Sequence, residues 1–323
     1  MKSPHPQPLP RARERGAQRT SPPAPLPQGE GSAGDDKQSW RFGAGLLAGL
    51  FLRSNSSPIR WLRLSLISGV VVYVGVLILA PVLALLVGAL QGGPGPIFAT
   101  FGDADAQAAF GLTLQIALIT VVVNGLLGTI TAWVLTRQRF PGRRLLNALV
   151  DLPFAMSPVV VGFVLILIFG RLGPLATLQD NLNIQVAFAV PGMVLATVFV
   201  TLPFMIRELM PVIAALDREQ EHAAATLGAS GWQTFLFVTL PALRWGILYG
   251  LVLTFARALG EFGAVLVVGG DIQGSTETAP LYIFRVLDDR NYAAAYSVAL
   301  ALGLISLALV LGIEQLRKRE RRA

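Results

Sequence analysis

The stretch AATLGASGWQTFLFVTLP, residues 224–241, lies between two long apolar segments and carries the signals of two short helices. Asp217 followed by Gln220 resembles a capping box, which predicts a first helix that runs to about Leu227. Gly228 comes next, and glycine readily adopts the left-handed conformation that ends many helices. This part of the chain therefore predicts a helix followed by a sharp turn.

The second half of the same stretch repeats the pattern. Ser230 and Gln233 resemble another capping box, and we expect Pro241 to end the helix that begins there. Three aromatic side chains in this half are too apolar for a free loop; they are Trp232, Phe235 and Phe237. We expect them either to pack on the rest of the protein or to fill a groove in a partner.

Composition places the surrounding chain in a membrane. Its 323 residues are 53% hydrophobic and 14% charged, with a mean hydropathy of +0.60, which is far more apolar than a soluble domain. There is no cysteine, and the two histidines, His5 and His222, form no H-E-x-x-H motif, so thiolate metal sites and a zinc-peptidase site are excluded. The net charge of +7 does not indicate nucleic-acid binding, because basic residues flank the apolar segments.

Six apolar segments are long enough to cross a bilayer, which takes about 20 helical residues. Outer-membrane strands would instead alternate over short segments. The sequence therefore predicts an all-α integral membrane protein, a six-transmembrane-helix bundle. The segments are residues 64–90, 111–136, 145–170, 184–206, 245–269 and 293–313.

Lysine and arginine set the orientation of these segments. With the N-terminus in the cytoplasm, 22 of the 26 basic residues fall on the cytoplasmic side, as the positive-inside rule requires. We therefore expect both termini in the cytoplasm, an inner-membrane location, and a 217–241 loop that faces the cytoplasm.

The ends of the chain differ from its apolar part. Residues 1–39 are rich in proline, arginine, glycine and serine, which predicts a disordered cytoplasmic tail. Residues 40–60 hold an apolar run too short to span, and we interpret them as an interfacial segment. Residues 61–316 then form the transmembrane domain, and residues 317–323 form a basic cytoplasmic tail.

Prolines at positions 153, 158, 191 and 203 interrupt the third and fourth segments. A proline frees a backbone carbonyl, which in lipid must find a protein partner or water. Ordinary kinking explains any one of these prolines, whereas four in neighbouring segments favour a transport pathway.

Two charged residues lie inside the fifth segment. Arg257 and Glu261 are four residues apart, so they share a helical face and can pair. A lone charge at mid-bilayer costs about 2.5–3.5 kcal/mol, so such residues normally face a bundle interior or a water-filled cavity. The pair is either a structural lock or part of a gate on an anion route, where Gly260 and Gly263 let backbones approach closely.

Other charged positions receive a structural interpretation. Asp151, near the cytoplasmic end of the third segment, is interpreted as a helix cap. Arg285, Asp288, Asp289 and Arg290 fall in the long outer loop and are interpreted as a solvated charge run.

The stretch HAAATLGASGWQTFLFVTLP resembles the EAA motif of ABC importer permeases. The matching residues are Ala223, Ala224, Gly228, Leu240 and Pro241. His222 occupies the motif's glutamate position, and Glu221 directly precedes it. Together with DLPFAMSPVVVGFV, TLPFMIRELMPV and ARALGEFGAVLVVGG, the motif makes residues 61–316 similar to the W-type permease subunits of sulfate/thiosulfate importers.

This resemblance implies the type I importer fold and a role for the 217–241 loop. In that family the loop is a coupling helix seated in a cytoplasmic ATPase, and it must be rigid to transmit force. The implied coupling residues are Glu221, His222, Ala223, Ala224, Gly228, Ala229, Trp232, Leu240 and Pro241. The residues interpreted as the translocation path or gate are Arg257, Gly260, Glu261 and Gly263.

The resemblance also implies partners. These are a cytoplasmic ATP-binding subunit in two copies, a second permease subunit as heterodimer partner, a periplasmic sulfate-binding protein and membrane lipid. The chain has no G-x-x-x-x-G-K-[ST] motif, so ATP hydrolysis is expected on a partner. We expect the chain itself to be no enzyme and to hold no metal or other cofactor.

Two alternatives stay open. Molybdate permeases share the GEFGA stretch, so the transported oxyanion could be molybdate rather than sulfate or thiosulfate. A secondary transporter would work alone and should show internal repeats and coupling acids at mid-span. We see no clear repeat, and Glu261 is the only acid well inside a segment.

Overall fold

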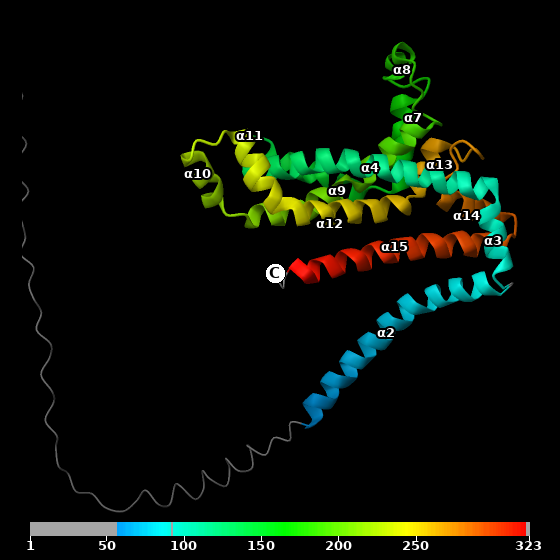
Figure 1. Ribbon diagram of the computed structural model, residues 1–323. Helices are drawn as coiled ribbons and strands as arrows, with labels where there is room; N and C mark the ends of the chain where they lie inside the picture. The colour runs from blue at the N-terminus through cyan, green and yellow to red at the C-terminus, as the bar shows by residue number, and fades with distance from the viewer. Residues whose placement is uncertain (1–56, 92, 321–323) are drawn as a thin grey trace, which may run out of the picture. The chain divides into compact units, whose positions relative to one another are not determined.

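The computed structural model describes residues 57–91 and 93–320 (Figure 1). All regular secondary structure within these residues is helical. The chain divides into two units, residues 1–69 and residues 70–323, and each is described by itself.

The first unit contains the start of helix α2 (Ser57–Leu90), which continues into the second unit. The predicted tail at 1–39 lies outside the described residues, as does most of the predicted interfacial segment at 40–60. The last residues of that segment form the first turn of α2.

Within the described residues, five helices are long and apolar enough to cross a membrane. This confirms a helical membrane bundle, because each of them falls on a predicted segment. The helices are α2, α4 (Ala104–Arg137), α9 (Val190–Ala215), α12 (Leu240–Leu259) and α15 (Tyr292–Glu320). Shorter helices lie between them: α3 (Gly95–Gly102), α8 (Ala176–Leu182) and α14 (Ala279–Asp288).

The third predicted segment, 145–170, is not one continuous helix. It is divided into α5 (Arg143–Val150), α6 (Leu152–Ala155) and α7 (Pro158–Phe169). Proline disfavours the helical conformation in the residue before it, and Ser157 is accordingly extended, with φ −64° and ψ 136°. The 12 residues of α7 rise only about 18 Å, which is less than the hydrocarbon core of a bilayer.

The other segment boundaries also move. The predicted span 245–269 is divided into α12 and α13 (Gly263–Gly269). Helix α9 begins at Val190, with Pro191 in its first turn where a missing N–H is harmless. The last helix continues beyond the predicted end at residue 313 and includes the start of the predicted basic tail at 317–323.

Helices α4, α9 and α12 run alongside one another and form the centre of the second unit (Figure 1). Small residues bring them together: a Cβ at Gly128 or at Gly250 would lie less than 3 Å from side-chain atoms of Met205. Asn124 is fully buried and donates hydrogen bonds to Thr201 Oγ1 (2.8 Å) and the Val198 carbonyl (3.2 Å). Close packing and interhelical hydrogen bonds of this kind hold membrane helices together where lipid removes the hydrophobic driving force.

Helices α7 and α13 touch at a glycine, which gives a stability prediction. A Cβ at Gly162 would lie 2.6 Å from the backbone carbonyl oxygen of Ala264. We expect Gly162→Ala to destabilise the protein by about 1–3 kcal/mol, because the two backbones must separate. The midpoint of thermal denaturation of the purified protein measures this loss.

The matched control is Gly111→Ala in α4, where an added Cβ would meet no heavy atom within 4 Å. Alanine favours helix over glycine by about 1 kcal/mol, so this variant should unfold at the same or a higher temperature. Equal stability of the two variants would show that α7 and α13 are not in tight contact.

Candidate functional site

The 217–241 loop begins with helix α10 (Arg218–Thr226). The Asp217 side chain caps it by accepting a hydrogen bond of 2.9 Å from the backbone N–H of Glu219. The predicted helix start is therefore confirmed, although the N–H that donates to Asp217 belongs to Glu219 rather than to Gln220.

Gly228 ends α10 in the left-handed conformation that the sequence predicts, with φ +87°. Its N–H donates to the Ala225 carbonyl (3.0 Å), and the Ala229 N–H donates to the Ala224 carbonyl (3.0 Å). These two bonds form a Schellman motif, which satisfies carbonyl groups at the helix end. The turn after α10 is therefore fixed by backbone hydrogen bonds.

The second half of the loop opens with the predicted capping box. The Ser230 N–H donates to Gln233 Oε1 (2.8 Å), and the Gln233 N–H donates to Ser230 Oγ (3.3 Å). Helix α11 (Gly231–Thr234) begins there and continues through the π-helical turn η1 (Phe235–Thr239) into α12.

The prediction that Pro241 ends this helix is wrong. Leu240 and Pro241 lie inside a helix that is continuous from Gly231 to Leu259. A proline has no N–H to donate and its ring clashes with preceding carbonyl groups. The widened π turn directly before Pro241 relieves that clash, so α11, η1 and α12 follow one another without a break in the helix, although the chain changes direction at the π turn (Figure 1).

The apolar side chains of the loop are divided between two environments. Phe235 is half-buried, with its ring edge-on to Trp133 of α4 at 6.0 Å. In contrast, Leu227, Trp232 and Phe237 are 89%, 68% and 76% exposed. One aromatic therefore packs on the bundle, and an apolar patch of Leu227, Trp232 and Phe237 is left exposed; that this patch fills a groove in a partner stays a prediction.

Glu221 attaches α10 to the rest of the bundle. Its Oε1 lies 3.5 Å from Arg137 Nη2 at the end of α4 and accepts a hydrogen bond of 3.1 Å from Thr239. Arg137 in turn donates to the Leu216 carbonyl (3.3 Å) and lies over the Trp133 ring. The carboxylate one position before the expected motif glutamate therefore joins α10 to both α4 and the π turn.

The remaining predicted loop residues lie on the surface of α10 and the turn. Ala224 and Ala229 are partly buried, whereas His222 and Ala223 are exposed. Sequence reasoning missed Arg137 as the partner of Glu221, although it begins the basic cluster at the end of the second predicted segment.

Arg257 and Glu261 pair as predicted, with 2.9 Å between Arg257 Nη1 and Glu261 Oε2. Glu261 lies just beyond α12, where it also accepts a hydrogen bond of 3.2 Å from the Ala264 N–H at the start of α13. Its side chain is 2% exposed, whereas that of Arg257 is 32% exposed. The pair therefore joins the two helices at a break in the membrane domain.

The two glycines beside this pair differ. A Cβ at Gly263 would lie 3.2 Å from Val159 Cγ2, so α13 approaches α7 closely there. A Cβ at Gly260 would meet no heavy atom within 4 Å. The close approach that the sequence predicts for both glycines therefore occurs within this chain at Gly263 and not at Gly260.

Asp151 is an ion-pair partner and not the predicted side-chain cap. It accepts two hydrogen bonds from Arg207, 2.8 Å from Nε and 2.6 Å from Nη2. Arg207 also donates to the side chain and the carbonyl of Asn147. This bidentate contact fixes the broken helix α5–α6 against α9.

The sequence places Arg285 in a solvated charge run, and for this residue the prediction is wrong. It lies 2.5 Å from the buried Glu277 carboxylate, which raises the Arg285 pKa, and 3.6 Å from Asp105. Neighbouring Tyr282 donates to Asp103 (3.2 Å), and burial together with the Asp103 charge raises the Tyr282 pKa to about 12. This end of the bundle is therefore joined by a charged network.

Comparison with known proteins shows what this chain is similar to. Residues 124–322 match the family described as binding-protein-dependent transport system inner membrane component. This range includes both the 217–241 loop and the Arg257–Glu261 pair.

Named relatives are similar over most of the chain. The sulfate transport system permease protein CysW of Escherichia coli (strain K12) is 46% identical over 79% of this chain and 88% of its own length. Sulfate permease 2, chloroplastic, of Chlamydomonas reinhardtii is 45% identical over 76% of this chain and 67% of its own. The CysT permease of the same E. coli strain is 38% identical over 76% and 89%.

Solved structures share the fold. A chain of a bacterial alginate ABC transporter in complex with an alginate pentasaccharide-bound periplasmic protein superposes with a TM-score of 0.68, at 17% identity, over 82% of this chain and 97% of that one. At this identity the likeness shows the fold, which is that of an ABC importer permease. The sequence match and the shared fold lead to the same conclusion: the chain belongs to the family of binding-protein-dependent transport system inner membrane components.

Proposed function

We propose that this chain is a membrane-spanning subunit of an ATP-driven importer and forms part of the translocation path for sulfate. The observation that carries this proposal is the 217–241 loop. It is held by the Gly228 turn, the Ser230 capping box and the Glu221 contacts, and it still exposes three large apolar side chains. A rigid loop with an exposed apolar patch is suited to docking on another protein.

The partner that this patch fits is a cytoplasmic ATPase subunit, present in two copies. Leu227, Trp232 and Phe237 would seat in its groove, since an amphipathic helix in a groove is a common recognition mode. The complete importer would also contain a second permease as heterodimer partner and a periplasmic sulfate-binding protein. This arrangement requires an inner-membrane location with both termini in the cytoplasm, as the distribution of basic residues predicts.

The second half of the loop is continuous with α12, which provides a route for force. Arg257 follows Pro241 by 16 helical residues, which corresponds to about 24 Å along the axis. Movement of the seated loop would therefore be passed along α12 to the break between α12 and α13. We infer that the Arg257–Glu261 pair at this break is part of the gate, with Arg257 supplying positive potential to an anion.

The substrate is tested by transport. In a host that lacks its own sulfate importers, expression of this chain with its partner subunits should restore uptake of radiolabelled sulfate, and depletion of ATP should abolish it. An excess of unlabelled thiosulfate or molybdate then measures selectivity. Uptake of molybdate but not of sulfate would show that molybdate, and not sulfate, is the substrate. Uptake that survives ATP depletion would indicate a secondary transporter.

Glu221 provides a prediction for the loop. We expect Glu221→Gln to lower uptake severalfold, because Arg137 loses its charged partner and a hydrogen bond to a charged group contributes about 1.5–3 kcal/mol. Radiolabelled sulfate uptake, normalised to the amount of chain in the membrane, measures the effect.

Glu219→Gln is the matched control, since it removes an exposed carboxylate from the same helix and should leave uptake near the wild-type level. Equal uptake in the two variants would contradict the anchoring role of Glu221.

A further inference from the structure

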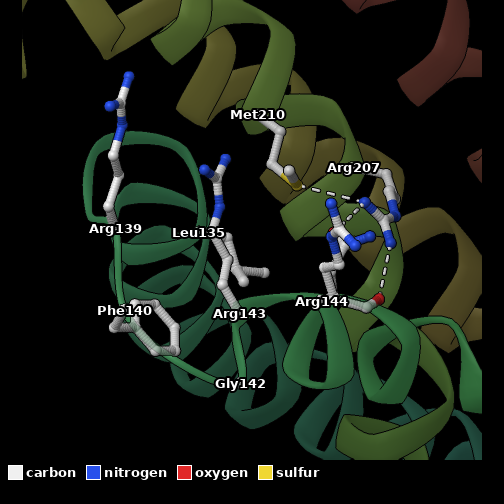
Figure 2. Close-up of a pocket in the computed structure, with 9 residues that line it drawn as sticks. Leu135, Arg139, Phe140, Gly142, Arg143, Arg144, Arg207 and Met210 are labelled. Atoms are coloured by element: carbon white, nitrogen blue, oxygen red, sulfur yellow. Dashed lines mark hydrogen bonds between the residues drawn. The ribbon is translucent and has the colours of Figure 1, made fainter.

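A cavity of about 660 Å³ opens at the end of the bundle where α4, α5 and α9 meet. Four arginines line it: Arg139, Arg143, Arg144 and Arg207. Figure 2 shows these arginines around the cavity, drawn from the segment after α4, from the first turn of α5 and from α9. We call these four residues the arginine pocket.

The charge of this pocket is not balanced. Among the described residues, the carboxylate paired with these arginines is Asp151, which binds Arg207 alone. None of the described residues that line the cavity is a carboxylate, so Arg139, Arg143 and Arg144 leave a surplus of positive charge. Like charges that line one cavity repel one another, and an anion in the cavity would reduce the repulsion.

The pocket is also held in place. Arg207 is fixed by its two hydrogen bonds to Asp151 and by those to Asn147, which itself lines the cavity. Arg143 and Arg144 stand at the start of α5, where Gly142 adopts φ +87° and no side chain caps the helix. Arg207 is therefore fixed by its partners and Arg143 and Arg144 by their place in a turn of defined geometry, whereas the side chains of Arg139 and Arg144 are exposed.

The outer side of α5 is apolar. Leu145 and Leu149, four residues apart on one face, are 65% and 50% exposed. A short helix with arginines on one side and exposed leucines on the other is typical of a segment at the membrane surface. Its arginines would therefore lie at the level of lipid headgroups.

Guanidinium groups bind phosphate and sulfate oxygens through paired N–H donors. We propose that the arginine pocket binds a tetrahedral oxyanion group, supplied either by the phosphate of an anionic phospholipid or by free sulfate. Basic pockets between membrane helices are a known form of lipid headgroup site. A sulfate site at this position would hold the ion where it leaves the protein. The sulfate alternative rests on the function proposed above, whereas the phospholipid alternative does not.

The test compares the full chain, purified with the subunits that accompany it, with the variant Arg143→Gln/Arg144→Gln. In one arm, native mass spectrometry follows binding of phosphatidylglycerol, with phosphatidylcholine as the neutral lipid. In the other, equilibrium dialysis follows radiolabelled sulfate on delipidated protein at an ionic strength held constant with chloride. Neither arm uses ATP or a binding protein, so the result does not depend on transport.

We expect one of the two ligands to bind the wild type with an affinity at least about tenfold higher than its affinity for Arg143→Gln/Arg144→Gln. The reason is that each basic residue near a headgroup contributes about 1 kcal/mol. Arg143→Lys/Arg144→Lys, which keeps the charge but loses paired donors, should fall between them. Arg171→Gln/Arg290→Gln removes two exposed arginines elsewhere and should bind like the wild type.

Gel filtration establishes that each variant is assembled; if the double glutamine variant is not, Arg144→Gln replaces it, because Arg144 is exposed. The arm that responds identifies the ligand. The proposal would be overturned if the variants at Arg143 and Arg144 bound both ligands as tightly as the wild type does. It would also be overturned if the Arg171→Gln/Arg290→Gln control lowered binding by the same factor.

Discussion

Gly228→Val is expected to lower ATP-driven sulfate uptake at least tenfold, to about the background level, while the chain stays in the membrane. The left-handed conformation of Gly228, φ +87°, costs any residue with a Cβ about 1–2 kcal/mol, and a β-branched residue more. An added Cβ would meet no heavy atom within 4 Å, so the cost is backbone strain confined to the turn. The helix after the turn would be redirected, and with it the exposed apolar patch. Radiolabelled uptake and quantitative blotting of membranes measure the two effects.

Two variants control this result. Gly228→Asn should keep much of the uptake, because asparagine tolerates the left-handed conformation. Gly231→Ala, three residues on, adds a Cβ that meets no heavy atom within 4 Å at a position without positive φ, and should behave like the wild type. Normal uptake by Gly228→Val would exclude a role of the rigid turn in coupling, and loss of the chain from the membrane would show that the turn is needed for folding instead.

Arg257→Met is expected to lower uptake about tenfold or more. Glu261 is almost completely buried, and removal of its partner 2.9 Å away leaves a carboxylate without its counter-charge. Breaking a buried pair costs about 3–5 kcal/mol, and we expect the lower end here because Arg257 is partly exposed. Loss of the positive charge would also remove the attraction for an anion at the break between α12 and α13.

A double variant separates the two effects. Arg257→Met/Glu261→Gln removes both charges, so assembly and thermal stability should return towards the wild-type level. If Arg257 attracts the transported anion, uptake by the double variant stays low. Full recovery of uptake would show that the pair is only a structural lock.

Local sequence signals were sufficient for the helix start, the turn and the capping box of the loop. The Gly228 turn and the Ser230–Gln233 capping box depend on backbone groups a few residues apart, so their residue types predict them directly. Composition predicts six spans, because the bilayer sets their length; among the described residues five of them contain a long apolar helix, whereas the third is divided.

The helix breaks were harder to predict, because a proline has different effects in different surroundings. Pro158 begins a helix after an extended Ser157, which divides the third predicted segment. Pro241 stands inside a continuous helix, because a π turn directly before it widens the backbone. Residue type alone does not distinguish these cases, since the outcome depends on which carbonyl groups find other partners.

Partners distant in the chain could not be predicted. Arg207 binds Asp151, 56 residues away, and Arg137 at the end of α4 lies beside Glu221 of α10. Each residue has several possible partners of opposite charge, and the packing of the helices selects among them. The arginine pocket arises in the same way from three separate segments.

The central claim is that the loop docks on an ATPase, and a cross-link from the loop tests it most directly. The chain contains no cysteine, so Leu227→Cys introduces a single thiol on a side chain that is 89% exposed. A benzophenone maleimide attached there, in membranes that contain the complex, should on illumination yield one adduct that mass spectrometry identifies as the ATP-binding subunit. Leu172→Cys, fully exposed in the segment between α7 and α8, should not yield that adduct. Adducts of Leu227→Cys only with this chain itself, or with no ATPase, would contradict the account.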